Sequence, residues 1–252
     1  MEVHHHSHLS SGETHRSRKK WTHYFWEFLM LFLAVFCGFL AEYQLEHKIE
    51  KTREKQYIKS FIEDLGADTA SLNARIEYCV LTIKRVDSAI AVLNHPELTN
   101  MAAEIYYFLR WIHRSDIFSV NDRTIVQLRN AGGMRLVSNK NVSDSMINYY
   151  KDVEYIRFIY EEQIEFRRSL RPHFPKLLDG NDYGKSIDEK NIVIRPIGPV
   201  QLRSADPETI NTFILVLNNI KGINSGLKRR MEDLKKRAVI IREFILKEYD
   251  LN

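Results

Sequence analysis

The residues best suited to metal chemistry lie at the N-terminus, in a histidine-rich tract. Its candidate ligands are His4, His5, His6 and His8. Neutral imidazoles are good ligands for zinc, copper and nickel. An unstructured polar tail or an expression tag is the alternative, although only three of these histidines are consecutive. We expect metal to bind adventitiously at this tract, and we predict neither a physiological metal site nor a cofactor.

A second residue that could take part in chemistry is Glu27, the single charged residue of an apolar run over residues 21–41. A carboxylate inside a membrane segment is by default a functional hypothesis. His23 precedes Glu27 by four residues, so the two side chains can meet on one helix face. The alternative, which we favour, is that Glu27 lies one or two turns from the membrane interface and reaches headgroup water.

Arginines are the third group that could do chemistry, by binding an anion. The set consists of Arg129, Arg135, Arg167, Arg168 and Arg171. They could gather if the helices around Gly132–Gly133 fold together, but solvated helix faces are the favoured interpretation. His113 and His173 are isolated from cysteines and from acids at ligand spacing. The sequence also lacks the nucleophile-elbow, phosphate-loop, dinucleotide-binding and HExxH zinc motifs, so we predict no catalytic residues and no enzyme.

Composition and charge narrow the function classes further. The chain carries 37 Lys and Arg against 33 Asp and Glu, a net charge of +4 that is spread along its length. A dedicated nucleic-acid surface needs a clustered basic face, so we predict no nucleic-acid partner. Hydrophobic residues make up 44% of the chain, enough to build a packed core. We expect no disulfide between Cys37 and Cys79, because Cys37 lies in the apolar run.

The element that carries Glu27 is predicted to be a transmembrane helix over residues 21–41. Phe28–Ala41 contains no charge, and the aromatic turn before it extends the run to about 20 residues, which matches a hydrocarbon core about 30 Å thick. The predicted membrane-interface residues are Trp21, Tyr24, Trp26, Lys19 and Lys20. A cleaved signal peptide is the alternative, but the end of the run lacks a small-x-small cleavage pattern.

The orientation of this helix rests on the basic residues that flank it. Four Lys or Arg lie in residues 16–20, directly before the span, whereas the basic residues after it begin at Lys48 and alternate with glutamates. Long following domains translocate largely regardless of their charge. We therefore predict a cytoplasmic tail over residues 1–20, a span over 21–41 and a periplasmic helical domain over 42–252.

Two heptad patterns indicate that the domain is mostly helical. Nine of the ten core positions of the first are apolar: Ile62, Thr69, Ile76, Ile83 and Ile90 at a, with Leu65, Leu72, Cys79, Val86 and Leu93 at d. The second starts at Asp206–Pro207–Glu208, an N-cap followed by proline and an acid in the first turn. Its core positions are Ile210, Leu217, Asn224, Met231, Ala238 and Ile245 at a, with Phe213, Ile220, Leu227, Leu234 and Ile241 at d. Asn224 either fixes the register or marks a solvated break.

Shorter elements are expected between the two heptads. Helices are predicted over residues 98–113, 122–130 and 143–170, the last with a stripe of tyrosines that we interpret as bundle core. Residues 171–205 are rich in proline and glycine and break the helical pattern, and Asn191–Ile197 is predicted to form one short strand. If the first and last long helices pair antiparallel, this insert lies at the far end of the bundle and is accessible to a partner.

Several segments resemble a known family. They are KKWTHYFWEFLMLFLAVFCGFLAE (Lys19–Glu42), REKQYIKSFIEDL (Arg53–Leu65), TIVQLRNAGGMRLVSN (Thr124–Asn139) and MINYY (Met146–Tyr150). Together they are similar to uncharacterised single-pass membrane proteins of Bacteroidota. The resemblance covers most of the chain and implies a bacterial inner-membrane protein that faces the periplasm. It implies no activity and no functional residues.

These observations predict an all-α protein in which the N-terminal transmembrane helix continues into an elongated helical bundle. The expected function is that of a membrane-anchored, non-enzymatic scaffold or protein-interaction module. A periplasmic ligand-sensing bundle that acts through a membrane partner is the alternative. The expected partners are membrane lipid and either a second copy of the chain or another membrane protein.

Overall fold

A computed structural model describes residues 16–114, 118–130 and 132–251, with side chains from Trp21 onward. The described chain is helical and contains no strand, so the predicted all-α class is confirmed. The chain divides into two compact units, Met1–Arg53 and Glu54–Asn252. One helix, α1 (Arg16–Leu93), has residues in both units, which confirms that the apolar helix continues without a break into the following segment.

In the first unit, α1 exposes almost all of its apolar side chains. From Trp21 to Ile49 every residue is exposed except the half-buried Leu29. Within the part of the chain that the structure describes, α1 is the one helix long and apolar enough to cross a membrane, with a mean hydropathy of 2.0 in its most apolar window. Apolar surface exposed on all sides of a helix matches contact with lipid tails better than contact with water.

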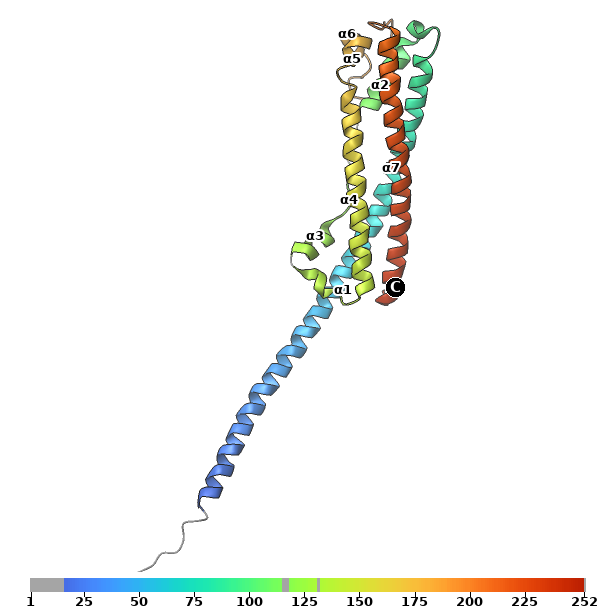
Figure 1. Cartoon of the computed structure of the whole chain (residues 1–252). Coiled ribbons are helices and arrows are strands. Elements are labelled where there is room, and N and C mark those ends of the chain that lie inside the picture. Colours follow the sequence, from blue (N-terminus) through green and yellow to red (C-terminus); the bar gives the residue numbers. More distant parts are fainter. Residues whose placement is uncertain (1–15, 115–117, 131, 252) are drawn as a thin grey trace, which may run out of the picture. The chain divides into compact units, whose positions relative to one another are not determined.

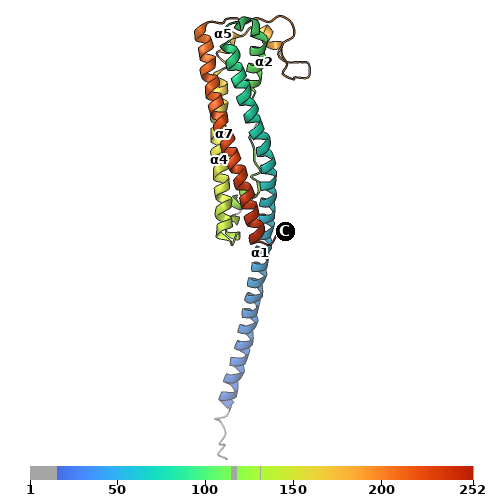
Figure 2. The same ribbon diagram turned by 90° about the vertical axis from the view of Figure 1, so that its right-hand side faces the viewer.

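The second unit is built from three long helices that run side by side in both views (Figures 1 and 2). They are the part of α1 from Glu54 onward, α4 (Lys140–Ser169) and α7 (Pro207–Glu248). The shorter elements are η1 (Leu98–Met101), α2 (Ala102–His113), α3 (Arg123–Asn130), η2 (Gly133–Leu136), α5 (Phe174–Leu177) and α6 (Gly180–Gly184). Together these elements bury two hydrophobic clusters, one along the α1–α3–α4 region and one around α2 and α5.

Two side-chain contacts show that α1 and α7 pair antiparallel, which was the condition for placing the insert at the far end of the bundle. The Lys221 Nζ of α7 lies 2.6 Å from the Asp87 Oδ1 of α1. Near the other end of the pair, the Tyr249 hydroxyl donates to Glu54 Oε1 at 2.7 Å. The C-terminal residues therefore return to Glu54, where the second unit begins, and the insert after α4 lies at the opposite end of the bundle (Figure 1).

The predicted heptad of α7 is confirmed by burial. All of its a and d residues are buried except Ile210, which is half-buried. Asp206 accepts a hydrogen bond from the Thr209 N–H at 2.9 Å and is the N-cap. Hydrogen bonds from Thr209 and Ser204 lower the pKa of Asp206 to about 2. The helix therefore begins where its sequence signal places it.

The predicted heptad of α1 is only half right. Its d residues are buried, but its a residues are all half-buried. The buried positions beside d are instead the g positions, which include Phe61, Asp68 and Thr82. Asp68 and Thr82 are polar, so a search for apolar periodicity passes over them and selects the isoleucines on the other flank.

The predicted strand over Asn191–Ile197 is wrong. Val193 forms only an isolated antiparallel bridge with Ile187. Asp188 accepts hydrogen bonds from the backbone N–H groups of Lys190 and Ile192, and Asn191 has a positive φ of 62°. This side chain–backbone turn takes up the donors that a longer ladder needs, so pairing ends after one bridge.

Candidate functional site: a surface groove and a buried polar layer

Three carboxylates on α1 hold the segment that carries α3 and η2. Asp64 accepts from the N–H and the hydroxyl of Thr124 and from Arg123, at the N-terminus of α3. Glu54 accepts from the N–H and hydroxyl of Ser138, both at 2.7 Å. A carboxylate at a helix N-terminus satisfies N–H groups that have no partner within the helix. These acids therefore have a structural role.

Asp68 is the most deeply buried of the three carboxylates. It accepts from the Asn121 N–H at 2.6 Å and from the Tyr149 hydroxyl at 2.8 Å. Burial raises the pKa of Asp68, against the opposing effect of these hydrogen bonds. The tyrosine stripe on α4 is therefore core, as predicted, and the Tyr149 hydroxyl lies in the interior.

A buried polar layer separates the two hydrophobic clusters. Gln163 of α4 donates to Asn224 Oδ1 of α7 at 2.6 Å, and Asn224 in turn donates to the Ile220 carbonyl at 2.7 Å. Both side chains are buried, so Asn224 does not mark a solvated break. Arg167 follows Gln163 by one turn and Thr82 of α1 is buried between Cys79 and Val86. Buried polar pairs of this kind can fix the register of packed helices.

Arg167 is the charged residue of this layer and is only 2% exposed. Its Nη1 donates to the carbonyls of Ile112 and Arg114, at the C-terminus of α2. The Tyr78 hydroxyl also donates to the Arg114 carbonyl, at 2.8 Å. A cation at a helix C-terminus interacts favourably with the helix dipole and with carbonyls that have no partner within the helix. Arg167 therefore caps α2 from a neighbouring helix.

His113 lies beside this arginine and is surrounded by positive charge. Burial lowers the pKa of His113, and the charges of Arg171, Arg167 and Arg110 lower it further. Its Nδ1 is buried without a hydrogen-bond partner. The ring packs edge-on against Phe174 of α5, at 5.3 Å between centroids. His113 is therefore a neutral imidazole in a basic surrounding.

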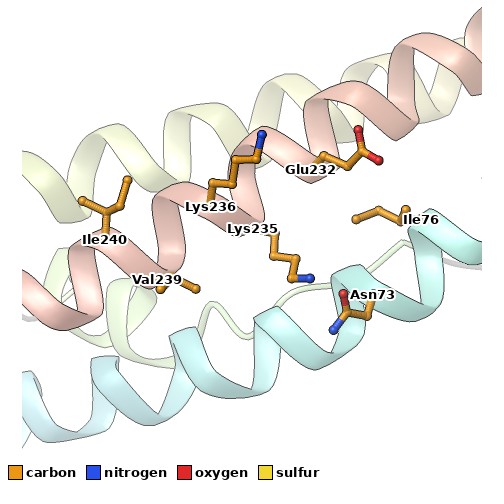
Figure 3. Close-up of a pocket in the computed structure, with 7 residues that line it drawn as sticks. All are labelled: Asn73, Ile76, Glu232, Lys235, Lys236, Val239 and Ile240. Atoms are coloured by element: carbon orange, nitrogen blue, oxygen red, sulfur yellow. The ribbon is translucent and has the colours of Figure 1, made fainter.

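A surface groove of about 720 Å³ lies between α1 and α7. Its lining residues are Asn73, Ile76, Glu232, Lys235, Lys236, Val239 and Ile240. Figure 3 shows that Asn73 and Ile76 come from α1 and the other five from α7, and that Lys235 extends toward Asn73. Ile76 is one of the a residues of α1, which were predicted to be core but are half-buried. The groove therefore lies where this row of a residues faces α7.

Charge and apolar surface coincide in this groove. Ile240 is 65% exposed and Val239 is 40% exposed. Glu232 lies 3.7 Å from Lys228 in an ion pair along the helix. Neither Lys235 nor Lys236 has an ion-pair partner within the described chain. The groove therefore combines an apolar floor with two uncompensated positive charges.

The exposed face of α4 has the complementary character. Phe158 is 59% exposed, and Glu161 and Glu162 follow it by three and four residues, where they flank it on the helix surface. Within the described chain neither glutamate forms an ion pair. The patch of Phe158, Glu161 and Glu162, called the α4 patch below, is apolar at its centre and negative at its rim.

The structure places some of the predicted site residues. Trp21, Tyr24 and Trp26 are exposed on α1, and their predicted position at a membrane interface stays a prediction. His23 Nε2 lies 3.2 Å from Glu27 Oε1, so the predicted meeting on one helix face is confirmed. The histidines of the N-terminal tract lie outside the described residues, as do the side chains of Lys19 and Lys20. No group of three potential metal ligands occurs in the described chain.

The less favoured interpretation, in which the five arginines gather, does not hold for the whole set. Arg129 and Arg135 lie on α3 and η2, before α4 begins, whereas Arg167 and Arg168 lie in its last turn. About 40 Å of helix separates the two groups, at 1.5 Å per residue. Arg168 lies 3.6 Å from Glu165 on a solvated face. Arg171, four residues after Arg167, does accompany it, and Arg110 and Arg114 join the pair from α2 and its C-terminal end.

One signal in the sequence could have identified the polar layer. Extending the apolar period of α4 from Val153 and Ile156 by one heptad reaches Tyr160 and Gln163, and the next core position is Arg167. Cys79, nearby on α1, has no chemical role that its environment supports, because burial raises its pKa to about 11.

Comparison with protein-family models, with curated proteins and with solved structures gives no match.

Proposed function

We propose that the protein is a non-enzymatic scaffold of the bacterial inner membrane that assembles with further copies of itself. The observation that carries this proposal is the complementarity between the α1–α7 groove and the α4 patch. Both belong to the second unit, and α1 links that unit to the apolar helix by an unbroken chain of helical residues. The N-terminal tail is cytoplasmic and residues 42–252 are periplasmic in this proposal.

The membrane span is supported by the exposure of α1 in the first unit. Sixteen large hydrophobic side chains between Trp21 and Ile49 are exposed, a quantity that water-soluble surfaces avoid. Glu27, paired with His23, lies in the second turn after Trp21 and reaches the headgroup region.

The contact between copies follows from charge and shape. Lys235 and Lys236 border an apolar groove, and Glu161 and Glu162 border the exposed ring of Phe158. A helix laid along a groove between two helices buries such a ring and pairs the rim charges, which favours one register over others. Groove and patch are different surfaces of one chain, so the contact is head-to-tail and generates rings or open rows. Rows in a membrane are what a scaffold requires.

Cysteine crosslinking between two differently tagged full-length copies in membranes tests this contact. One copy carries Ile240→Cys and the other Phe158→Cys, both in a background with Cys37→Ser and Cys79→Ala. We expect a crosslinked heterodimer. The matched control replaces Phe158→Cys with Ile197→Cys, a site in the insert that is 85% exposed and would collide more often in random encounters.

Charge exchange sharpens the test. We expect Lys235→Glu with Lys236→Glu to abolish the crosslink, and Glu161→Lys with Glu162→Lys in the other copy to restore it. A yield equal to that of the Ile197→Cys control, or insensitive to both exchanges, contradicts the proposal. Crosslinking between two Ile240→Cys copies alone also contradicts it, because that product requires a symmetric groove-to-groove contact.

The orientation is tested separately, with a reporter enzyme that is active only in the periplasm. We expect activity when the reporter follows Asn252 and none when it precedes Met1. The reverse pattern contradicts the proposed orientation and leaves the groove contact to be judged by the crosslinks.

A further inference from the structure

The guanidinium of Arg167 uses only one of its edges. Nη1 caps α2, whereas Nε and Nη2 are buried and have no hydrogen-bond partner among the described residues. These two nitrogens lie next to each other along one edge of the guanidinium plane and form a fork of parallel N–H donors. Such a fork matches the spacing of two oxygens of a carboxylate, sulfate or phosphate group.

Within the part of the chain that the structure describes, the fork also lacks a counter-charge. No Asp or Glu in the described ranges forms an ion pair with Arg167, and the residues that act electrostatically on neighbouring His113 are three arginines. A buried charge without a partner is costly, because desolvation is not offset by a Coulomb attraction. The arrangement therefore favours the entry of a small negative group from outside the chain.

Other buried polar atoms of the described chain also lack a hydrogen-bond partner. Besides Arg167, the buried atoms without a partner include Nδ1 of His113, Nε of Arg110 and Oε1 of Gln163. Arg167 and Arg110 contribute N–H donors, and His113 contributes a titratable imidazole. Gln163 contributes an acceptor. A water molecule could bridge Gln163 to the fork, but water brings no charge to a site that has an excess of cations.

From this geometry we propose that Arg167 binds a small free oxyanion at its Nε–Nη2 edge, between the end of α2 and the last turns of α4. The ligand class is an anion that presents two coplanar oxygens, such as sulfate, phosphate or a small carboxylate. His113, Arg110 and Arg171 add positive potential around it, and Gln163 hydrogen-bonds a protonated oxygen or a shared water. The site goes beyond the scaffold role and gives the bundle a means of responding to a ligand.

Thermal unfolding of the full chain in a non-ionic detergent tests the site. Sodium sulfate, phosphate and acetate are titrated at millimolar concentrations against sodium chloride at matched ionic strength. We expect a saturable rise in Tm with at least one oxyanion. The absence of anionic lipid from the sample excludes a headgroup as the source of the response.

A pair of neighbouring variants separates binding from general salt effects. Arg167→Lys keeps the charge but loses the fork, so we expect the apparent affinity to fall about tenfold or more. Arg168→Lys is the matched control, because Arg168 is exposed and paired with Glu165, and it should respond like the wild type. A rise in Tm that does not saturate and is equal in all three proteins is the stabilisation that sulfate gives any protein, and it overturns the proposal.

A spectroscopic measurement keeps the proposal open to refutation if Arg167→Lys fails to fold. A bound anion stabilises the protonated imidazole, so the pKa of His113 followed by NMR should rise on addition of the oxyanion. His173 provides an internal comparison and should not move with it. Arg171→Gln, an exposed change, should weaken binding a few-fold by removing a nearby charge. An unchanged pKa of His113 at saturating sulfate shows that the fork is hydrated only and overturns the proposal.

Discussion

Asp64 and Glu54 on α1 each accept hydrogen bonds from a backbone N–H and from hydroxyls, whereas Arg167 on α4 leaves two of its donors without a partner. Both regions place charged side chains in the interior of the same bundle. Asp64 serves the N-terminal end of α3, Glu54 accepts from Ser138 directly before α4, and the arginine serves the C-terminal end of α2. Among the described residues, the carboxylates have all of these hydrogen bonds, whereas two donors of Arg167 have none.

The difference distinguishes a polar group that holds the fold from one that is available to a ligand. A satisfied carboxylate contributes through the donors it pairs, so removing it leaves those donors buried and unpaired. Arg167 is buried with two unpaired N–H donors, and this burial already costs folding free energy. Removing the arginine therefore removes that cost as well as its hydrogen bonds. Deletion at the two regions should therefore have unequal consequences, although Arg167 is as buried as the carboxylates.

Deletion of the Asp64 carboxylate should have the largest effect. In Asp64→Ala the N–H and the hydroxyl of Thr124 lose their acceptor in a buried position. We expect the free energy of unfolding to fall by about 3 kcal/mol, with faster hydrogen exchange in α3. The control is Glu63→Ala, whose side chain is 75% exposed and should cost less than about 0.5 kcal/mol. Equal losses in the two variants would remove the structural role assigned to Asp64.

The pH dependence of stability should separate a buried carboxylate from an exposed cap. Burial raises the pKa of Asp68 above 3.8, so the folded state holds its proton more tightly than the unfolded state. The contribution of Asp68 is full below about pH 4 and is lost as pH rises through the folded-state pKa. In Asp68→Asn we expect no such fall in the free energy of unfolding as pH rises. Urea unfolding of both proteins at a series of pH values measures this difference.

Asp206 provides a control of opposite sign. Its pKa is lowered to about 2, so its contribution is present above about pH 4 and is lost as pH falls toward 2. Asp206→Asn should therefore flatten the acid side of the profile, whereas Asp68→Asn flattens the side toward neutral pH. Two profiles with the same sign would show that Asp68 is ionised in the fold as readily as a surface acid.

Much of this fold is predictable because its long helices follow apolar periodicity. The heptad of α7 needs only its own sequence: its core positions are apolar but for Asn224, and Asp206 and Pro207 mark its start. On α1 the same reasoning selects the a residues, because Asp68 and Thr82 at g are polar and their burial depends on partners in distant segments. Periodicity identifies a helix reliably, but it assigns the wrong face wherever the core contains satisfied polar groups.

The candidate sites were less predictable, for a related reason. Arg167 was among the arginines considered, but its companions Arg110 and Arg114 belong to α2, and only the packing of α2 on α4 joins them. The α1–α7 groove depends on how two helices diverge, which no local signal in Ile76 or Lys235 encodes. Sites built from one helix are visible in sequence, and sites built between helices require the register of their packing.

Removal of Arg167 should have the smallest effect, and it is the most direct test of the comparison. Arg167→Met keeps much of the side-chain length and loses the charge. Two carbonyls at the end of α2 lose a donor, but the chain no longer buries a cation with two unpaired N–H groups. We expect the free energy of unfolding in anion-free buffer to change by less than about 1 kcal/mol, against about 3 kcal/mol for Asp64→Ala.

The comparison fails if Arg167→Met is as damaging as Asp64→Ala in that buffer. Such a loss would mean that the Nη1 bonds to the Ile112 and Arg114 carbonyls outweigh the cost of burying the charge, so that Arg167 is a structural residue like the carboxylates. In the expected case the two variants diverge further when sulfate is added, because the wild type gains stability that Arg167→Met cannot gain. Asp64→Ala retains the fork and should gain as much as the wild type, so the order of the three proteins in sulfate identifies which buried charge serves the fold and which serves a ligand.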